Sequence, residues 1–372
     1  MNQEILQKIQ QKASNCGFEE FGVTNFNDFD FYTKHLNSFI KKKYYGEMAW
    51  LKEKAQARKN PKNMWKEAKS ALVFALNYGP EKNPLPGLKE KNKAYISIYA
   101  RRKDYHKIIK AKLKEIAKYI KTVSPVEVKV FVDTAPLMEK PLAELANLGW
   151  IGKHTNLVSR NFGSWLFLGI ILIDKELNNE GSKNQNCGSC NACIDICPTN
   201  AIVEPYKLDA RKCISYLTIE HKSSIEEKYR TLIGNRIFGC DDCLSICPWN
   251  KFAKKYRESK FEYINKLDLP KLKTLTTFTE MQYHNYFSGT ALKRLGYNRF
   301  KRNLLIAVGN SKDISMIKFV LENLNNENEM VRCMAVWALK MLNKKFFLSE
   351  KKKRYRFEKS IAIKQEWDNN SL

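Results

Sequence analysis

Two runs of cysteines in the middle of the chain have the residue types and spacing of an electron-transfer site. The first run, Cys187 to Pro198, reads Cys-Gly-Ser-Cys-Asn-Ala-Cys-Ile-Asp-Ile-Cys-Pro, and the second, Cys240 to Pro248, reads Cys-Asp-Asp-Cys-Leu-Ser-Ile-Cys-Pro. Two-residue gaps let successive thiolates bind one 4Fe–4S cluster, whereas the three-residue gap turns the last cysteine of a run toward a second cluster. The sequence therefore predicts two 4Fe–4S clusters.

Crossing over of the last cysteine in each run defines a ligand set for each cluster. The set for cluster I is Cys187, Cys190, Cys193 and Cys247, and the set for cluster II is Cys197, Cys213, Cys240 and Cys243. A zinc site would need only four ligands, and a disulfide framework is typical of short secreted chains, so both fit this pattern less well. Cys16 and Cys333 lie outside it and are expected to be buried apolar residues.

Composition limits the classes to which the protein can belong. Its 372 residues are enough for two or three domains, and 44% hydrophobic residues is typical of a soluble globular protein. The first thirty residues lack the apolar segment of a signal peptide, and the longest apolar run, Trp165 to Ile173, is too short to span a bilayer. Together with thiolate-bound clusters, these features predict a cytoplasmic protein without a membrane partner. Nothing suggests an obligate oligomer, so a monomer is expected.

The chain is strongly basic, with 65 Lys and Arg against 39 Asp and Glu and a net charge of +26. The positive electrostatic field of such a protein concentrates polyanions around it, so nucleic acid is the first partner to consider. The alternative is a Lys-rich surface that only faces solvent. Residues 251–372 hold 26 Lys and Arg against 12 Asp and Glu, so the excess is densest after the cysteine runs. The Lys-rich stretch 351–359 is either part of such a contact or a disordered end.

The elements before the cysteines predict a mixed α/β domain. Continuous apolar runs predict buried strands at 71–76 and 165–173, another strand is expected at 126–132, and apolar spacing predicts an amphipathic helix over 104–121. The strand at 126–132 ends at Asp133, and strand ends that lead into helices are where α/β proteins place chemistry. Neither a G-x-G-x-x-G nor a P-loop pattern is present, so neither nucleotide fingerprint is found.

Helices are expected after the cysteines. Amphipathic patterns cover 291–310, 314–324 and 330–342, and the last is similar to the second helix of a HEAT repeat. The predicted fold class is α+β multidomain, with a mixed α/β domain at 1–175, a ferredoxin-like module with two clusters at 176–250, and a basic helical HEAT-like domain at 251–372.

The clusters need a partner cofactor, since they move one electron at a time and do no substrate chemistry alone. Flavin and corrinoid are the candidates. The Asp-x-His-x-x-Gly motif that supplies an axial histidine is incomplete, because Asp104-Tyr105-His106 is followed by Ile109 where Gly is required. A corrinoid would therefore bind without a protein His ligand, and His154 is expected to be a pocket or core residue.

Five further sequence blocks join the cysteine runs and the N-terminal α/β block in one pattern. The resemblance that they carry covers nearly the whole chain. They are Val-Asp-Thr-Ala-Pro at 132–136, Gly-Ser-Trp at 163–165, Arg-Lys-Cys-Ile-Ser-Tyr-Leu-Thr at 211–218, Ile-Gly-Asn-Arg at 233–236 and Cys-Pro-Trp-Asn-Lys at 247–251. With these blocks and the eight cysteines, the sequence resembles the epoxyqueuosine reductase family. The cysteine pattern alone would also fit the related reductive dehalogenases. The third and fifth blocks narrow the resemblance to the epoxyqueuosine reductase family.

The resemblance implies a cobalamin-dependent enzyme with a cobalamin-binding domain at 1–175 and a tRNA-binding domain at 251–372. Its reaction would be the last step of queuosine synthesis, in which the epoxide of epoxyqueuosine is reduced to the cyclopentene-diol of queuosine. The substrate would be the wobble base of tRNAs with a GUN anticodon, those for Tyr, His, Asn and Asp, with electrons from an unidentified low-potential donor. A tRNA substrate would account for the basic C-terminal third.

The same resemblance implies roles for individual residues. Asp133 would donate a proton to the epoxide oxygen, for which burial would have to raise its pKa, and the alternative is a helix N-cap before Ala135-Pro136. Cobalamin contacts are expected at Arg58, Ser97, Asp133, Leu157, Leu168 and Ser215, although Leu157 and Leu168 are equally well core residues. Contacts with tRNA are expected at Lys222, Lys293, Arg294, Arg299, Lys301 and Arg302, with a solvated surface as the alternative.

Two other functions stay open at this point. One is a corrinoid and iron–sulfur reductase of a small molecule, similar to a dehalogenase, which would have no use for a basic C-terminal domain. The other is an electron carrier that serves a partner enzyme, against which the 175 residues before the clusters argue.

Overall fold

The structure is a computed structural model that describes residues 1–177, 186–253 and 263–369. Its contacts divide the chain into two compact units, each built from three separate segments. Unit 1 comprises Met1–Asn83, Asp104–Arg211 and Asp242–Glu262, and unit 2 comprises Pro84–Lys103, Lys212–Asp241 and Tyr263–Leu372. These units differ from the three consecutive domains expected from the sequence, because the segments 84–103 and 212–241 pack with the C-terminal helices.

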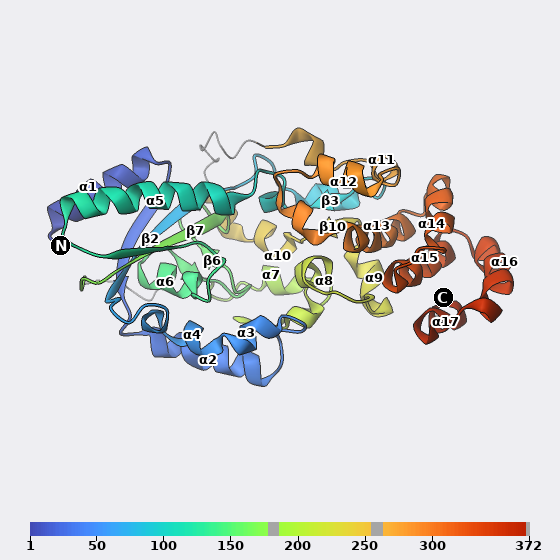
Figure 1. Cartoon of the computed structure of the whole chain (residues 1–372), viewed down its shortest axis with the longest axis horizontal. Helices are drawn as coiled ribbons and strands as arrows, with labels where there is room; N and C mark the ends of the chain where they lie inside the picture. The colour runs from blue at the N-terminus through green and yellow to red at the C-terminus, as the bar shows by residue number, and fades with distance from the viewer. Residues whose placement is uncertain (178–185, 254–262, 370–372) are drawn as a thin grey trace. The chain divides into compact units, whose positions relative to one another are not determined.

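Unit 1 is built on a four-stranded antiparallel sheet with the order β1-β2-β7-β4. Its strands are β1 (Glu20–Asn25), β2 (Ser70–Asn77), β7 (Leu166–Ile173) and β4 (Val128–Phe131). Both central strands, β2 and β7, are buried along almost their whole length, which confirms the strands predicted from continuous apolar runs. Helices cover both faces of the sheet, so these strands need no polar side (Figure 1).

The helices on the sheet are α1 (Gln3–Asn15) and α5 (Tyr105–Val123) on one face, and α6 (Glu139–Leu145) and α2 (Phe29–Lys41) on the other. Burial of Ile109, Leu113 and Ile116 confirms the inner face predicted for the helix over 104–121. This helix lies very close to β7, because a Cβ atom at Gly169 would come within 2.7 Å of Leu113 Cδ1. A glycine on the strand therefore sets how closely α5 approaches the sheet.

Short elements complete unit 1 around its cysteines. They are α3 (Ala49–Glu53), α4 (Ala55–Lys59), β5 (Trp150–Ile151), β6 (Leu157–Val158), α7 (Ala192–Asp195), β8 (Ile202–Glu204), β9 (Lys207–Leu208) and α10 (Asp242–Ser245). Each cysteine run contains one short helix, α7 or α10, and these two helices pack together. The side chain of Asn250 donates to Leu244 O (2.5 Å) and accepts from Ser164 N–H (3.1 Å), so it ties the second run to the turn before β7.

Unit 2 combines one parallel strand pair with an array of helices. The pair is β3 (Tyr95–Ile96) with β10 (Arg236–Phe238), and the helices are α8 (Ile214–Ile219), α9 (Glu227–Ile233), α11 (Leu272–Leu275), α12 (Glu280–Tyr286), α13 (Tyr297–Ser311), α14 (Ile317–Asn323), α15 (Glu329–Leu342), α16 (Lys344–Arg354) and α17 (Ile361–Asp368). The central helix of the C-terminal array is α15, which packs against α13, α14, α16 and α17 (Figure 1).

The helices expected over 314–324 and 330–342 are confirmed as α14 and α15. The helix expected over 291–310 is confirmed from Tyr297 onward as α13. Before it, Ala291–Leu295 form a 3₁₀ helix, and the two are separated at Gly296, whose φ of +83° belongs to the left-handed region that favours glycine. No helix in the described ranges is long and apolar enough to cross a membrane.

Buried polar side chains of α13 fasten the separate segments of unit 2 together. Arg302 is fully buried and donates to the carbonyl oxygens of Leu217 (2.6 Å), His221 (2.7 Å) and Ser223 (2.9 Å). Its neighbour Asn303 donates to two more carbonyl oxygens of the segment 212–241. Because buried carbonyl groups need hydrogen-bond donors, this segment and α13 depend on one another.

Replacing Arg302 with Met should destabilise unit 2. The buried Leu217 O would lose its donor, at about 1–3 kcal/mol, and two partly buried carbonyl oxygens would lose theirs at a smaller cost, so we expect the free energy of unfolding to fall by about 2 kcal/mol or more. Urea denaturation of the full chain, followed by far-ultraviolet circular dichroism, measures the change. Lys293→Met, at an exposed position, is the matched control and should stay within about 0.5 kcal/mol of the parent. Equal urea midpoints for the two variants would contradict this account of Arg302.

Candidate functional site

Four of the predicted cluster ligands surround one cavity in unit 1. Cys187, Cys190, Cys193 and Cys247 line a space of about 110 Å³ together with Lys153, His154 and Trp249. Burial and the nearby thiol of Cys187 raise the pKa of the Cys193 thiol to about 11. Because a cluster binds thiolates, a positively charged iron–sulfur core would have to displace these protons on binding. The structure thus brings together the whole ligand set expected for cluster I.

Lys153 holds the loop that carries the first two of these cysteines. Its buried ammonium group donates to Gly188 O (2.9 Å), Cys190 O (2.8 Å) and Asn191 Oδ1 (3.0 Å). The three N–H groups of one Nζ atom thus donate to three acceptors of the same loop, which stabilises the conformation of the loop. Sequence reasoning missed this residue, since a Lys distant from the motif gives no local signal.

His154 is a core residue, as expected. It is 2% exposed, its Nδ1 accepts from Asn156 N–H (3.1 Å), and its Nε2 therefore carries the hydrogen and donates to Ser164 Oγ (3.2 Å). Burial lowers the pKa of His154 to about 4, so the ring is neutral. Both ring nitrogens therefore make hydrogen bonds within the protein.

The ligand set expected for cluster II is divided along the chain. Cys197 and Cys243 belong to unit 1, whereas Cys213 and Cys240 belong to unit 2. Cys197 Sγ accepts a hydrogen bond from Ala201 N–H (3.3 Å). This ligand set stays a prediction.

Asp133 lies on a strained turn directly after β4. Its φ is +45°, and Thr134 N–H donates to Val132 O across it. A residue other than glycine in this region costs roughly 1–3 kcal/mol, and such strain clusters at functional sites. Its side chain is 60% exposed, and it caps no helix, because α6 begins after Met138. The N-cap alternative is therefore wrong.

The carboxylate of Asp133 faces the first turn of α5. Its Oδ2 accepts from Tyr105 OH and lies 3.5 Å from His106 Nε2. The other ring nitrogen of His106, Nδ1, lies 2.6 Å from Asp104 Oδ1. Asp133 N–H donates to Glu139 Oε1 (2.5 Å). Three carboxyl groups, an imidazole and a phenol thus form one hydrogen-bonded group.

The pKa values within this group are shifted in opposite directions. The hydrogen bond from His106 lowers the pKa of Asp133. Burial alone would lower the pKa of His106, but hydrogen bonds to Asp104 and Asp133 raise it to about 9. Burial and the nearby charge of Asp133 raise the pKa of Glu139 to about 8. At neutral pH Asp133 is therefore ionised, and His106 and Glu139 are protonated.

The other residues expected to contact cobalamin differ in their burial and in their hydrogen bonds. Arg58 stacks over the Trp50 ring at 5.1 Å, and its Nε is buried without a hydrogen-bond partner among the described residues. Leu157 and Leu168 are core residues, 4% and 8% exposed. Ser97 is 2% exposed and its hydroxyl donates to Asp241 Oδ1 (2.6 Å), so its cobalamin contact stays a prediction. Ser215 is half-buried on α8.

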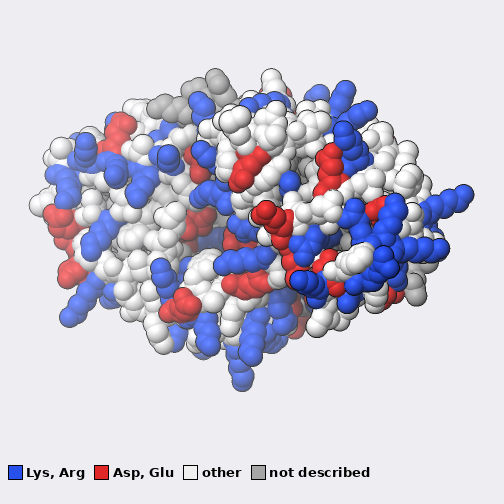
Figure 2. Space-filling view, turned by 45° about the vertical axis from the view of Figure 1, so that its right-hand side comes forward, with Lys and Arg blue, Asp and Glu red and all other residues white. Residues whose placement is uncertain are grey.

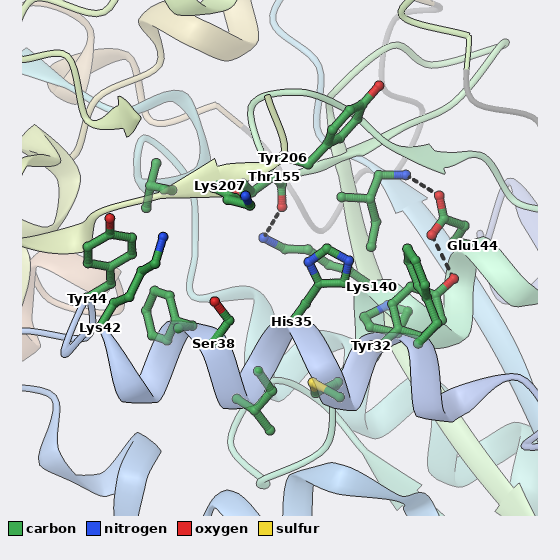
Figure 3. Close-up of a pocket in the computed structure, with 17 residues that line it drawn as sticks. Tyr32, His35, Ser38, Lys42, Tyr44, Lys140, Glu144, Thr155, Tyr206 and Lys207 are labelled. Atoms are coloured by element: carbon green, nitrogen blue, oxygen red, sulfur yellow. Dashed lines mark hydrogen bonds between the residues drawn. The ribbon is translucent and has the colours of Figure 1, made fainter. Parts of the chain in front are cut away.

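A cavity of about 370 Å³ lies between α2 and α6 in unit 1 (Figure 3). His35 and Ser38 point into it from α2, and Lys140 donates to Asn156 Oδ1 (2.7 Å) at its side. The carboxylate of Glu144 is fully engaged there, accepting from Tyr32 OH and from a backbone N–H, both at 2.7 Å. The remaining lining is largely apolar, and its aromatic residues are Phe31, Phe39, Tyr44 and Tyr206. Its size and aromatic walls suit a flat ring system, such as part of a cofactor.

The six residues expected to contact tRNA divide into exposed and structural groups. Lys222, Lys293 and Arg294 are exposed in unit 2. Arg299 donates to Ile219 O (2.6 Å), and Lys301 Nζ lies 4.6 Å from the centre of the Tyr297 ring. Both side chains are thus half-buried and contact other residues of unit 2. The expectation for Arg302 is wrong, because this side chain is fully buried and bonded to carbonyl oxygens.

Basic side chains also gather on the surface of the C-terminal helices (Figure 2). The Lys-rich stretch is ordered, since 344–354 form α16 and a 3₁₀ turn follows at Tyr355–Phe357. The exposed basic residues of this stretch are Lys352, Lys353, Arg356 and Lys359. A disordered end is therefore excluded for this stretch.

Comparison with known proteins gives two family matches. A family model described as "4Fe-4S double cluster binding domain" matches residues 186–250, and one described as "Epoxyqueuosine reductase QueG, DUF1730" matches residues 58–134. The chain is 38% identical to the epoxyqueuosine reductase of Salmonella typhimurium over 338 residues, which cover 90% of this chain and 88% of that one. It is 39% identical to that of Xanthomonas campestris over 336 residues, with 89% and 94% covered.

Solved structures of epoxyqueuosine reductases have the same fold. One with an epoxyqueuosine-modified tRNA-Tyr stem loop is 26% identical with a TM-score of 0.88, covering 98% of this chain and 97% of that one. The Streptococcus thermophilus enzyme is 27% identical with a TM-score of 0.84, covering 99% and 98%. The Bacillus subtilis enzyme, 25% identical with a TM-score of 0.88 and 98% and 97% covered, was solved with its catalytic aspartate loop swung out of the active site.

Replacing Lys153 with Met should prevent stable binding of cluster I. The apolar side chain has a similar volume but leaves three acceptors of the cysteine loop without a donor. After anaerobic reconstitution we expect roughly half the iron and acid-labile sulfide of the parent, because only cluster II would remain. Lys118→Met, at an exposed position of α5, should bind iron as the parent does. Full iron content in Lys153→Met would show that the loop holds its shape without this residue.

Proposed function

The chain belongs to the epoxyqueuosine reductase family, and from this premise we propose which of its residues carry out the reduction. The reaction converts the epoxide of epoxyqueuosine in tRNA to the cyclopentene ring of queuosine. Two C–O bonds break, one C=C bond forms and the oxygen leaves as water, so each turnover consumes two electrons and two protons. The protein must therefore supply electrons, a nucleophile and an acid at one place.

Electrons pass through two 4Fe–4S clusters in the double-cluster domain. Cluster I takes Cys187, Cys190, Cys193 and Cys247, and cluster II takes Cys197, Cys213, Cys240 and Cys243. Such clusters carry single electrons at low potential, which suits a donor such as a ferredoxin-type protein. The cavity shared by the first four cysteines supports this assignment.

Cobalamin, when bound, supplies a strongly reducing cobalt nucleophile for attack on the epoxide. The residues present fit this group at Arg58, whose buried Nε has no hydrogen-bond partner among the described residues and suits a polar group of the cofactor. Leu157 and Leu168 contribute apolar packing to this cobalamin-binding region, and Ser215 is a further contact.

Asp133 is the acid that protonates the epoxide oxygen. A strained ether oxygen is a poor leaving group until it is protonated, and a positioned carboxylic acid contributes about 10²–10⁴-fold to such a step. The observation that carries this role is the position of Asp133 on a strained, exposed turn, facing Tyr105 and His106. The relative with a movable catalytic aspartate loop supports the same assignment.

The tRNA is bound by the basic surface of unit 2, where Lys222, Lys293 and Arg294 are exposed. The relative solved with a tRNA stem loop supports an anticodon stem loop as the ligand. The HEAT-like arrangement of α13 to α17 provides the scaffold of this surface. The substrates are tRNAs with a GUN anticodon, and the protein acts as a monomer in the cytoplasm.

Replacing Asp133 with Asn should abolish the reduction while cofactor binding is retained. In a single-turnover assay with reconstituted protein, cobalamin, a low-potential reductant and an epoxyqueuosine-containing stem loop, we expect the rate to fall at least about 10²-fold. Mass spectrometry of the nucleosides measures the loss of one oxygen. Asp30→Asn, an exposed residue of α2, should react as the parent does. An unchanged rate in Asp133→Asn would remove Asp133 from the mechanism.

Replacing Lys293 and Arg294 together with Gln should weaken tRNA binding and reduce its salt dependence. Each phosphate contact contributes about 0.7–0.9 to the slope of log Kd against log salt, so we expect the slope to fall by about 1.4–1.8. Fluorescence anisotropy with a labelled stem loop measures Kd at several salt concentrations. The double variant Lys110→Gln and Lys114→Gln on α5 carries the same charge change and should keep the parent slope. Equal slopes for both double variants would place the tRNA elsewhere.

A further inference from the structure

The reaction needs more protons than one carboxylic acid can hold. Each of the two C–O bonds that break leaves its electrons on oxygen, so two protons must reach that oxygen in one turnover. Asp133 carries no more than one, and beside His106 it is ionised before substrate binds. A neighbouring group must therefore load the acid.

The geometry around Asp133 contains such a group. Asp104 Oδ1 lies 2.6 Å from His106 Nδ1, and His106 Nε2 lies 3.5 Å from Asp133 Oδ2. Asp104 therefore fixes the ring so that its second N–H points at Asp133. The same logic orients the histidine of a catalytic triad, where a carboxylate on one ring nitrogen sets the task of the other. The imidazole is 17% exposed, so it can exchange protons with water.

We propose that His106, oriented by Asp104, is the proton reserve of the active site and reloads Asp133 for both protonations of the departing oxygen. This inference rests on the proposed role of Asp133. In each transfer the Nε2–H bond of His106 breaks, an O–H bond forms on Asp133 Oδ2, and the proton of Asp133 passes to the substrate oxygen. The two electrons come from the clusters. Between the two transfers His106 takes up a proton from bulk solvent through the exposed part of its ring, so both protons consumed in a turnover come from solvent.

Exclusion of water by the bound cofactor and tRNA drives the proton transfer from His106 to Asp133. In contact with water the pair is an ion pair, Asp133 carboxylate with His106 imidazolium, because water solvates both charges. When cofactor and tRNA exclude water, the cost of burying two charges rises and the neutral pair becomes favourable. The proton then lies on Asp133, next to the epoxide. His106 thus acts through Asp133, as a positioning and proton-supplying residue.

Other titratable groups around Asp133 are less suited to this task. Tyr105 already donates to Oδ2, and its phenol is too weak an acid to load a carboxylate. Glu139 contacts the backbone of Asp133, because its Oε1 accepts from the backbone N–H of that residue. Lys140 donates to Thr155 O and Asn156 Oδ1. The guanidinium of Arg58 keeps its protons at any relevant pH.

The test is the pH dependence of single-turnover reduction by the reconstituted enzyme. In the parent, the rate in the limit of low substrate should be constant near neutral pH. It should fall as the pH rises through about 9, where His106 of the substrate-free enzyme loses its proton. In His106→Asn we expect a rate about 10²-fold lower at pH 7, without this alkaline limb, and partial rescue by added imidazole. His284→Asn, a half-exposed residue of α12, is the control and should match the parent in rate and profile.

A second variant separates orientation from folding. Asp104→Asn keeps the N-cap of α5, since Asn caps as well as Asp, but removes the charge that faces His106. The pKa of His106, followed by NMR of the cobalamin-free protein with labelled histidine, should fall toward its ordinary value, and the alkaline limb should move to lower pH with it.

The outcomes distinguish this inference from the proposed function. A parent-like rate and profile in His106→Asn would overturn the proton reserve while the function stands. A slower His106→Asn enzyme that keeps the parent alkaline limb, or gains nothing from imidazole, would make His106 merely structural and would also overturn it. No reduction by the parent, with clusters and cobalamin bound, would refute the proposed function itself.

Discussion

The contact between the turn after β4 and the first turn of α5 is the constraint on which the acid site depends. Asp133 is held at a φ of +45°, a conformation that persists only where neighbouring contacts over-determine it. Tyr105 supplies one such contact and stacks on Phe167 of β7, with ring centres 4.0 Å apart. Gly169 of the same strand lets α5 lie close to the sheet. One strand of the core thus sets the distance between the acid and its histidine.

Positive charge serves two different purposes in this protein. Lys153 and Arg302 are buried, and each satisfies several carbonyl oxygens at points where the backbone has no secondary-structure partner. Lys293 and Arg294 are exposed, where charge can act on a polyanion. The net charge of +26 therefore overstates the charge available for binding, because part of it is consumed by the fold.

Sequence patterns predicted the features that depend on local spacing. The ligands of cluster I, the buried strands β2 and β7 and the inner face of α5 all follow from motif spacing or periodicity, and the structure agrees with each. The buried Arg302 was misassigned and the anchor Lys153 was missed. Each depends on partners far along the chain, and a charged side chain has the same local signature whether it faces water or a carbonyl oxygen. His106 was noticed only as part of an incomplete motif, because its partner Asp133 lies on another element.

The interleaved order of the segments has a consequence for synthesis on the ribosome. The strand β3 emerges early, but its partner β10 follows about 140 residues later and α13, which holds that region, later still. At about 5–20 residues per second, the segment 84–103 waits on the order of 10 s or more for its first partner. Its apolar residues Tyr95, Ile96 and Ile98, fully buried in the finished protein, are exposed during that interval. The nascent chain therefore presents a natural binding site for chaperones at this segment.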